Sequence, residues 1–269
     1  IADRETGGFV RVDGDRKLRH YQARPETDRY FGLGDKAGPL DRHGRRFRVL
    51  QLDALGYDAE IGDPLYKHVP FTIVRSGEGG EAVAGGLFYD SLAPMVFDMG
   101  CERSNYHGLY RYVETDEPGL DLWLIAGPDV ASVTRRFTLL TGRPTLPPRW
   151  SFGFAFTSMH HADDEKAQEV IAGFAERCRA EGIPLAAIHF GSGYSSRGKR
   201  RYVFTWNKDK FPDPKALFAR LTELGFPTVA NLKPVLIDDH PDYAGVKAAG
   251  GFIKDSAGAP VLEQFWDGM

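Results

Sequence analysis

The sequence has few cysteines and no excess of charge of either sign. Its 269 residues include two cysteines, 34 basic and 37 acidic residues, for a formal net charge of −3. Cys101 and Cys178 do not make a disulfide framework, so a reducing compartment is the simpler interpretation. The balanced charge gives no electrostatic argument for nucleic acid or an anionic membrane surface. We therefore expect neither as a partner, and we expect a cytoplasmic protein.

Several kinds of segment and site are also missing. No apolar run approaches the roughly 20 residues that span a bilayer, and we expect no signal peptide. Neither a Gly-x-Gly-x-x-Gly turn nor a P-loop is present, which opposes a nucleotide site. His160 and His161 have no partners at metal-ligand spacing. We expect no metal and no cofactor, and we interpret the basic runs 42–48 and 197–201 as solvated loops.

What the sequence does contain falls into two contrasting parts. The first part alternates between short apolar runs and turns, and the runs lie at 47–52, 68–74, 82–89 and 120–125. Many short strands with frequent turn signals are typical of an antiparallel sandwich. A short helix is predicted over 129–140. We therefore predict a β-sandwich domain over residues 1–145.

Residues 146–269 instead alternate strands with helices. Three strands are predicted, a buried one at 152–157 and two more at 185–190 and 227–235, with amphipathic helices between them. Asp163 and Asp164 are expected to cap the first helix, and Gly182 and Gly225 to end the two helices. This order favours parallel strands with helices packed outside, in either an open doubly wound sheet or a barrel.

The two parts meet at a proline-rich joint, residues 140–154, which reads LTGRPTLPPRWSFGF. Its three prolines fix φ and bias the preceding residues toward extended geometry, so neither a helix nor a strand runs through it. Further motifs flank the joint: YFGLGDK at 30–36, DPLYKHVPF at 63–71, GGLFYDS at 85–91, FTWN at 204–207 and FPDP at 211–214. In this order they resemble the glycoside hydrolase family 31 α-glucosidases and α-xylosidases.

The resemblance implies a galactose-mutarotase-like β-sandwich followed by a (β/α)8 TIM barrel. A full barrel takes roughly 250 residues, so residues 146–269 supply only its first part and we expect a truncated piece of a larger enzyme. The implied activity is that of a retaining, exo-acting α-glycosidase, α-glucosidase-like, that hydrolyses O-glycosyl bonds at an α-linked non-reducing-end sugar of a carbohydrate. The oligomeric state stays open.

Retaining glycosidases need two carboxylates about 5–5.5 Å apart, one as nucleophile and one as acid/base. No segment of this sequence resembles the motif that carries either group in the family. The acidic residues Asp238, Asp239 and Asp267 are interpreted as loop, cap or terminal residues, because Asp is common at helix caps. We therefore assign no catalytic residue within the chain.

The segment after the second predicted strand departs from the family pattern. Gly191 and Gly193 stand where the family usually has aspartates, the second of which holds sugar hydroxyls. Either Ser192, Tyr194 or a loop residue replaces that contact, or the two glycines only shape a wider turn. Barrel enzymes bind substrate at the C-terminal ends of their strands, so Ser192 and Tyr194 are candidate substrate-binding residues.

Five more residues complete the candidate substrate site. Leu236 falls on a position that the resemblance assigns to the apolar wall of the sugar pocket. Lys233 replaces an acid, and it either binds a polar substituent or pairs with a carboxylate. Trp206 either stacks on a sugar or belongs to the core or a lid. Asp63 and Tyr66 lie in a sandwich loop that, by the resemblance, reaches over the barrel mouth, although an Asp-Pro pair is also a common turn start.

Two rival hypotheses remain. A non-catalytic carbohydrate-binding or structural module is favoured by the missing aspartates and the missing nucleophile motif. A nucleotide-dependent α/β enzyme is opposed by the lack of a phosphate-binding turn. An incomplete barrel is also expected to expose large apolar faces, so we predict that a chain of this length is poorly soluble by itself.

Overall fold

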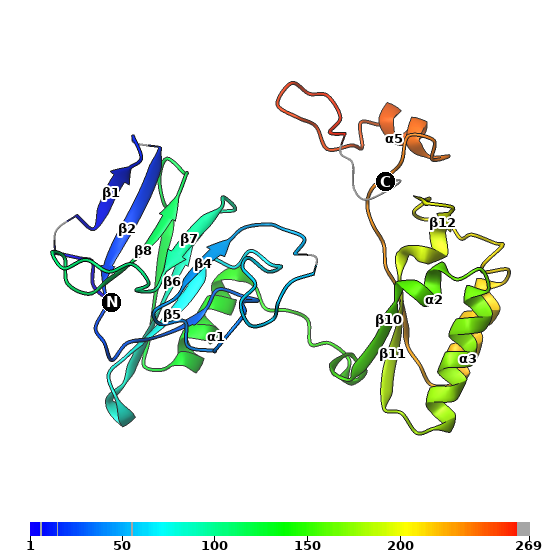
Figure 1. Cartoon of the computed structure of the whole chain (residues 1–269), viewed down its shortest axis with the longest axis horizontal. Helices are drawn as coiled ribbons and strands as arrows, with labels where there is room; N and C mark the ends of the chain where they lie inside the picture. The colour runs from blue at the N-terminus through cyan, green and yellow to red at the C-terminus, as the bar shows by residue number, and fades with distance from the viewer. Residues whose placement is uncertain (6, 15, 55, 263–269) are drawn as a thin grey trace. The chain divides into compact units, whose positions relative to one another are not determined.

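The computed structural model describes residues 1–5, 7–14, 16–54 and 56–262 (Figure 1). The chain divides into two compact units, Ile1–Pro144 and Thr145–Met269. The first contains two antiparallel sheets, and the second contains a parallel sheet with helices. Asp267 lies outside the described residues. Among the described helices, none is long and apolar enough to cross a membrane.

The first unit is an antiparallel β-sandwich. One sheet has the order β1-β2-β8-β7-β4, with strands Phe9–Val12, Lys17–Ala23, Tyr110–Thr115, Met95–Asp98 and Arg46–Val49. The other has the order β3-β5-β6-β9, with strands Arg29–Gly32, Phe71–Ser76, Val83–Tyr89 and Leu122–Gly127. A single 3-10 turn, Gly79–Glu81, joins β5 to β6. The apolar runs expected to form strands do so.

The core of the sandwich comes from the inner faces of the two sheets. Side chains alternate across each strand, so every second residue points toward the facing sheet. Tyr30 and Val74, which pair across β3 and β5, meet Phe47, Phe97 and Val113 of the other sheet in one buried cluster. Burying side chains of this size contributes about 1.5–3 kcal/mol each, which is what holds the two sheets together.

A helix covers the outer face of the four-stranded sheet. α1 (Val130–Thr141) begins at Asp129, whose carboxylate accepts a hydrogen bond from the Ser132 N–H at 2.7 Å. Phe137 of this helix stacks on Phe71 of β5 with ring centroids 3.8 Å apart. Figure 1 shows α1 beside β5 and β6. The helix predicted over 129–140 is therefore confirmed.

The second unit begins a strand–helix alternation. Its sheet has the order β10-β11-β14, with parallel strands Phe154–Ser158, Leu185–Phe190 and Thr228–Ala230. Its helices are α2 (Met159–Asp163), α3 (Ala167–Ala180), α4 (Pro214–Glu223) and α5 (Tyr243–Ala248), with 3-10 turns at Arg149–Phe152 and Ser192–Ser195. A small hairpin pairs β12 (Ser196–Arg197) with β13 (Arg200–Arg201).

The predicted amphipathic helices bury the expected faces. Ile171 and Cys178 of α3 pack with Leu217 and Leu221 of α4 and with Phe190 of β11 in one core. Both helices end where a glycine adopts a positive φ: Gly182 at 68° and Gly225 at 76°. Cys178 is buried and unpaired, and Cys101 of the first unit is also a free thiol.

Two predicted element boundaries in the second unit are wrong. Asp163 and Asp164 do not cap α3: the residue before that helix is Lys166, which makes no side-chain cap bond, and Asp163 instead closes the short helix α2. The third strand ends at Ala230 rather than at 235. Residues 231–237 are instead irregular, although they carry the apolar side chains that suggested a longer strand.

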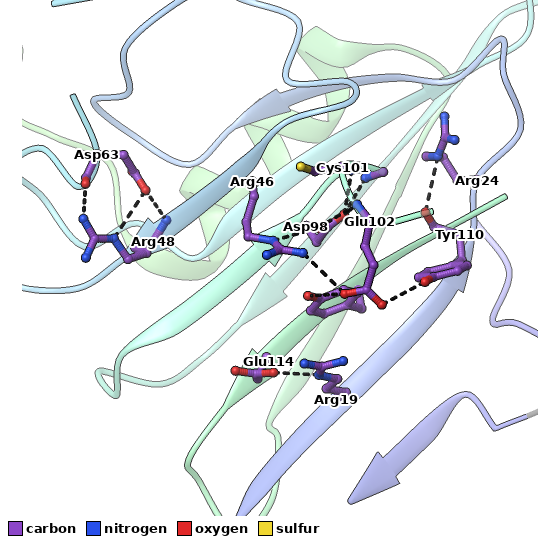
Figure 2. Close-up of polar contacts among 12 residues, drawn as sticks. Arg19, Arg24, Arg46, Arg48, Asp63, Asp98, Cys101, Glu102, Tyr110 and Glu114 are labelled. Carbon is purple, nitrogen blue, oxygen red and sulfur yellow. Dashed lines mark hydrogen bonds and ion pairs between the residues drawn. The ribbon is translucent and has the colours of Figure 1, made fainter. Parts of the chain in front are cut away.

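The basic run 42–48 is not a solvated loop. Arg42 is buried and donates to the Pro39 carbonyl at 2.7 Å, and Arg46 begins β4. Arg46 Nε donates to Asp98 Oδ2 at 2.8 Å, as Figure 2 shows. The run 197–201 forms most of the β12–β13 hairpin, and its residues 197–200 are exposed, as expected of a solvated segment. Charge runs are usually solvated, but in the run 42–48 the Pro39 carbonyl and the Asp98 carboxylate accept hydrogen bonds from the arginines.

Candidate functional site

The loops after β10, β11 and β14 lie at one edge of the second unit's sheet. Because the three strands are parallel, their C-terminal ends meet at the same edge. Helix α2 follows β10, the 3-10 turn Ser192–Ser195 follows β11, and the irregular segment 231–237 follows β14. Substrate sites of parallel α/β folds lie at this edge. It is the candidate site of this unit.

Ser192, Tyr194 and Trp206 come together at this edge. Ser192 and Tyr194 are both buried within the 3-10 turn after β11. The Tyr194 and Trp206 rings lie 4.6 Å apart, and the Tyr194 hydroxyl donates to the Asn231 carbonyl at 2.8 Å. Burial raises the pKa of Tyr194, so its hydroxyl stays protonated as this donor. The pair therefore ties the end of β11 to the end of β14.

Trp206 is half-buried and packs against the core of the second unit. Its ring lies 5.3 Å from that of Phe211 and 5.8 Å from that of Phe218. Of the two interpretations that the sequence left open, this packing favours a core position over an open stacking platform. At the edge of the sheet, the Trp206 ring also packs against Tyr194.

Asp163 organises a polar network beside this pair that sequence reasoning missed. Arg201 binds its carboxylate in bidentate fashion, with Nη1 to Oδ1 at 2.6 Å and Nη2 to Oδ2 at 2.9 Å. Lys210 Nζ donates to the Asp163 carbonyl at 2.7 Å and to Ser196 Oγ at 2.9 Å. Asn207 Nδ2 donates to the Ser196 carbonyl at 2.6 Å. These hydrogen bonds connect the β12–β13 hairpin to α2 through Asp163 and to the FTWN motif through Asn207.

Arginine side chains also determine how the carboxylates at this edge titrate. The bidentate Arg201 guanidinium holds the pKa of Asp163 below its usual range. Desolvation tends to raise the pKa of Asp239, but hydrogen bonds from Tyr202 and Arg200 and the charge of Arg200 lower it. Both groups are therefore carboxylates held by cations. A general acid needs a raised pKa, so neither fits that role.

Lys233 and Leu236 lie in the segment after β14. Both are half-buried, and they follow the short strand by three and six residues. Asp239, three residues beyond Leu236, forms an ion pair with Arg200 of the hairpin. Asp238 and Asp239 lie in a loop, as expected, but they do not cap a helix, because α5 begins later, after Asp242.

Asp63 and Tyr66 lie in the first unit and contact different partners. Asp63 Oδ2 accepts from the Arg48 N–H at 2.7 Å (Figure 2). Its Oδ1 lies 3.4 Å from the Nζ of buried Lys36. Tyr66 is partly exposed, stands edge-on to Tyr57 at 6.2 Å, and a hydrogen bond to Asp53 raises its pKa. Asp63 therefore pins its loop to β4, while Tyr66 keeps an accessible ring face.

Comparisons with known proteins match both units. The sequence profile of the glycosyl hydrolase 31 N-terminal galactose mutarotase-like domain matches residues 4–98, and that of the family 31 TIM-barrel domain matches residues 144–269. The chain belongs to glycoside hydrolase family 31. The resemblance inferred from the motifs is thereby confirmed, and the second unit is the start of a TIM barrel rather than of a doubly wound sheet.

Relatives within family 31 include an alpha-glucosidase of Saccharolobus solfataricus, 30% identical over 245 residues, and an alpha-xylosidase of Emericella nidulans, 26% identical over 239 residues. The alignments cover 88% and 89% of this chain but 32% and 28% of those proteins. A family 31 dextranase of Flavobacterium johnsoniae shares the fold, with a TM-score of 0.79 at 24% identity, over 99% of this chain and 30% of its own. This chain thus spans about a third of their length.

The departure from the family pattern at position 193 has a steric cause. A Cβ atom on Gly193 would lie 2.5 Å from both the carbonyl carbon and the oxygen of Ala162 in α2. A Cβ atom on Gly191 would lie 3.3 Å from Met159 Cα. Contacts below 3.0 Å are not tolerated between such atoms, so helix α2 leaves no room for a side chain at 193.

Metal ligation has no support in the described part of the chain. No group of three or more His, Cys, Asp or Glu side chains among those residues is arranged to hold a metal ion. Of the two adjacent histidines after β10, His161 Nδ1 lies 2.8 Å from Ser158 Oγ. The sequence held only part of the signal for the missed Asp163 network: Asn207 ends the FTWN motif and Lys210 directly precedes the FPDP motif.

Proposed function

We propose that the protein containing this chain is a retaining, exo-acting α-glycosidase of the α-glucosidase type. The observation that carries the proposal is the match of both family 31 profiles, in order, on the two units. The named activities of its relatives, alpha-glucosidase and alpha-xylosidase, support the reaction class. Its substrate is then a carbohydrate with an α-linked sugar at the non-reducing end, and residues 1–145 and 146–269 act as its sandwich and barrel domains.

The described residues contribute to binding rather than to bond cleavage. Retention needs two carboxylates about 5–5.5 Å apart, one of them protonated at rest. Asp163 and Asp239, the carboxylates held at the candidate edge, are each bound by an arginine. We therefore place no nucleophile and no acid/base on them, and we expect the 269-residue chain by itself to be inactive.

The candidate residues take different parts in this proposal. Lys233 and Leu236 contact the sugar from the end of β14, and Ser192 lies in the turn beneath it. Tyr194 and Trp206 hold that turn in place, which is consistent with their mutual packing. Asp63 anchors the sandwich loop that presents Tyr66 to the substrate. A cytoplasmic location rests on the two free cysteines alone.

Hydrolysis of aryl α-glucoside, α-xyloside and α-galactoside tests the proposal. The panel is measured with the 269-residue chain and with the longer protein that contains it. Activity in the longer protein alone is the expected result. Binding of maltose or isomaltose without hydrolysis in both forms would instead establish a non-catalytic carbohydrate-binding module. Hydrolysis by the short chain would show that an acid such as Asp239 is catalytic.

A matched pair of variants tests the binding role of the segment after β14. Leu236→Ala in the active protein is expected to raise KM by about 10-fold, since a lost apolar side chain in a pocket costs about 1–3 kcal/mol. Leu232→Ala, at an exposed position four residues earlier, is the control and should leave KM unchanged. An equal effect of both variants would contradict a specific contact at Leu236.

A further inference from the structure

A cavity of about 700 Å³ lies between the two sheets of the first unit, and pockets for small organic molecules have volumes of this order. Strands β1 and β2 of one sheet and β5, β6 and β9 of the other contribute to its walls. Phe9 and Leu124 line it from the edge strands β1 and β9 and are 53% and 71% exposed, so the cavity is open to solvent along this side. Most of the side chains that line it are apolar.

Two hydrogen-bond acceptors lie beside each other in the wall of this cavity. Asp3 and Gln22 both line it and pair directly in an antiparallel bridge. Their side chains therefore lie on the same face, with Cβ atoms about 4.5–5.5 Å apart. Gln22 is 1% exposed, whereas the Asp3 side chain is 51% exposed. The carboxylate thus lies at the mouth of the cavity, and the carboxamide lies deeper inside.

The deeper of these two groups lacks a partner. The side-chain oxygen of Gln22 has no hydrogen-bond partner among the described residues. A buried acceptor without a donor is unfavourable, because it has lost its hydrogen bonds to water and gained none from the protein. A carboxamide oxygen accepts hydrogen bonds and cannot donate them. A ligand that satisfies Gln22 must therefore carry an N–H or O–H donor.

The charge at the mouth of the cavity favours a cationic donor. Asp3 is the one charged side chain among the described residues that line the cavity. His20 Nε2 donates to Asp3 Oδ1 at 2.8 Å, and its Nδ1 accepts from the Tyr89 hydroxyl at 2.9 Å. Burial lowers the pKa of His20, so its ring is neutral at pH 7 and leaves the Asp3 charge uncancelled. A carboxylate accepts up to about four hydrogen bonds, so Asp3 can bind a cation as well.

The buried Arg111 restricts where that cation can lie. Arg111 pairs with Gln22 across β2 and β8, although it is not among the described residues that line the cavity. Its positive charge repels a cation that contacts Gln22 alone. A cation that contacts the Asp3 carboxylate at the same time gains an attraction that offsets this repulsion. The favoured position is therefore between the two acceptors rather than at the inner end.

We propose that this cavity binds a small primary ammonium ion with an apolar body. The ammonium group has three N–H donors, which suffice to bridge the Asp3 carboxylate and the Gln22 oxygen. The apolar body lies along Phe9, Val83 and Leu124, whose side chains are otherwise exposed. The inference does not depend on the proposed glycosidase activity.

Calorimetric titration of the full 269-residue chain with 2-phenylethylammonium at pH 7 tests the site. The alcohol 2-phenylethanol retains the ring and one donor without the charge, and the N,N,N-trimethyl derivative retains the ring and the charge without a donor. Saturable 1:1 binding of the primary ammonium, at least tenfold tighter than that of either comparison compound, is the expected result. Equal binding of either compound, or no binding of the primary ammonium, would overturn the proposal and leave internal water or Arg111 as the partner of Gln22.

A matched pair of carboxylate variants tests the role of Asp3. Asp3→Asn keeps the size of the side chain and an oxygen for the His20 N–H, and it is expected to weaken binding of the primary ammonium at least tenfold. Asp116→Asn removes the same charge from an exposed position near the opposite end of β2 and should change the affinity less than twofold. Equal affinities of the two variants would contradict a contact between the ammonium group and Asp3.

Two exposed leucines provide a second pair that does not alter a polar group. Leu124→Trp narrows the mouth from β9 and is expected to weaken binding at least tenfold. Leu92→Trp lies outside the cavity and should leave the affinity unchanged. If Asp3→Asn does not fold by circular dichroism, the leucine pair decides. Equal affinities of the two tryptophan variants would place the binding elsewhere and refute the site.

Discussion

The Oδ1 atom of Asp163 lies 2.6 Å from the position that a Cβ atom on Gly193 would occupy. The carboxylate that closes α2 thus fills the space that a side chain at 193 would need. Arg201 fixes that carboxylate there through two hydrogen bonds. The glycine and the ion pair are therefore parts of one arrangement, in which α2 and the turn after β11 come into backbone contact.

Gly193→Ala is expected to destabilise the second unit by about 1–3 kcal/mol, the usual cost of overpacking a close contact. The added methyl group meets the Ala162 backbone, which is not free to move as the end of a flexible side chain is. Urea unfolding followed by tryptophan fluorescence measures the change.

Gly173→Ala is the matched control in the same unit. Gly173 lies within α3, and a Cβ atom there meets nothing within 4 Å. Alanine in a helix interior is favoured over glycine by about 0.5–1 kcal/mol, so this variant should be slightly more stable. Equal stability of the Gly193 and Gly173 variants would show that α2 moves aside.

The Asp163–Arg201 pair predicts a pH dependence for the second unit. Arg201 lowers the pKa of Asp163 in the folded state from its ordinary value of 3.8. A lowered carboxyl pKa contributes stability that is complete above the unfolded-state pKa and is lost as pH falls through the folded-state value. The stability difference between the wild type and Asp163→Asn should therefore shrink as the pH is lowered below about 4.

Urea titrations between pH 3 and pH 6 measure this difference. Asp209→Asn serves as control, because Asp209 is exposed and is in none of the ion pairs among the described residues. Its difference from the wild type should be small and independent of pH. A constant deficit of Asp163→Asn across the range would mean that the pair contributes through packing and not through charge.

Asp63→Ala is expected to destabilise the first unit by roughly 3 kcal/mol, since it leaves the Lys36 ammonium buried without its carboxylate. The Lys36 side chain is fully buried, and burial already lowers its pKa. Asp35→Ala removes an exposed ion pair with Lys67 and should cost less than about 1 kcal/mol. Thermal unfolding of both variants measures the two losses of stability. Equal losses would show that Asp63 is not needed to compensate the Lys36 charge.

Tyr194→Phe removes the hydrogen bond to the Asn231 carbonyl and is expected to cost about 1 kcal/mol of stability. In an active form of the protein, KM should change less than about twofold, because each factor of ten needs 1.4 kcal/mol and the hydroxyl already has a partner. A larger rise in KM with unchanged stability would assign the hydroxyl to the substrate instead.

The 269-residue chain is predicted to self-associate. Phe152, Phe154 and Leu232 of the second unit are each more than 60% exposed, and apolar side chains in such numbers favour association. Sedimentation velocity at increasing concentration should show species larger than the 29.9 kDa chain. A single species at all concentrations would contradict the prediction of poor solubility.

The sequence by itself determined the architecture of this protein. Alternating runs in the first half, helical stripes such as Ile171 and Cys178 in the second, and the proline joint between them follow from local chemistry. Such patterns depend on neighbours within one strand or one helical turn, so they can be recognised in the sequence without knowledge of the fold. The motif order determined the family for the same reason, because it is a property of the linear chain.

Tertiary structure alone decided the roles of individual charged side chains. Asp163 looks like a helix cap from its neighbours, yet its partner Arg201 is 38 residues away in sequence. The run around Arg46 looks solvated in the sequence, but in the fold Arg46 donates a hydrogen bond to Asp98 of a neighbouring strand. Arg111 looks like an ordinary strand residue in the sequence, and only the fold shows that it is buried, with no hydrogen-bond partner for its Nε among the described residues. Electrostatic and steric environments depend on residues distant in sequence, so the fold must exist before they are defined.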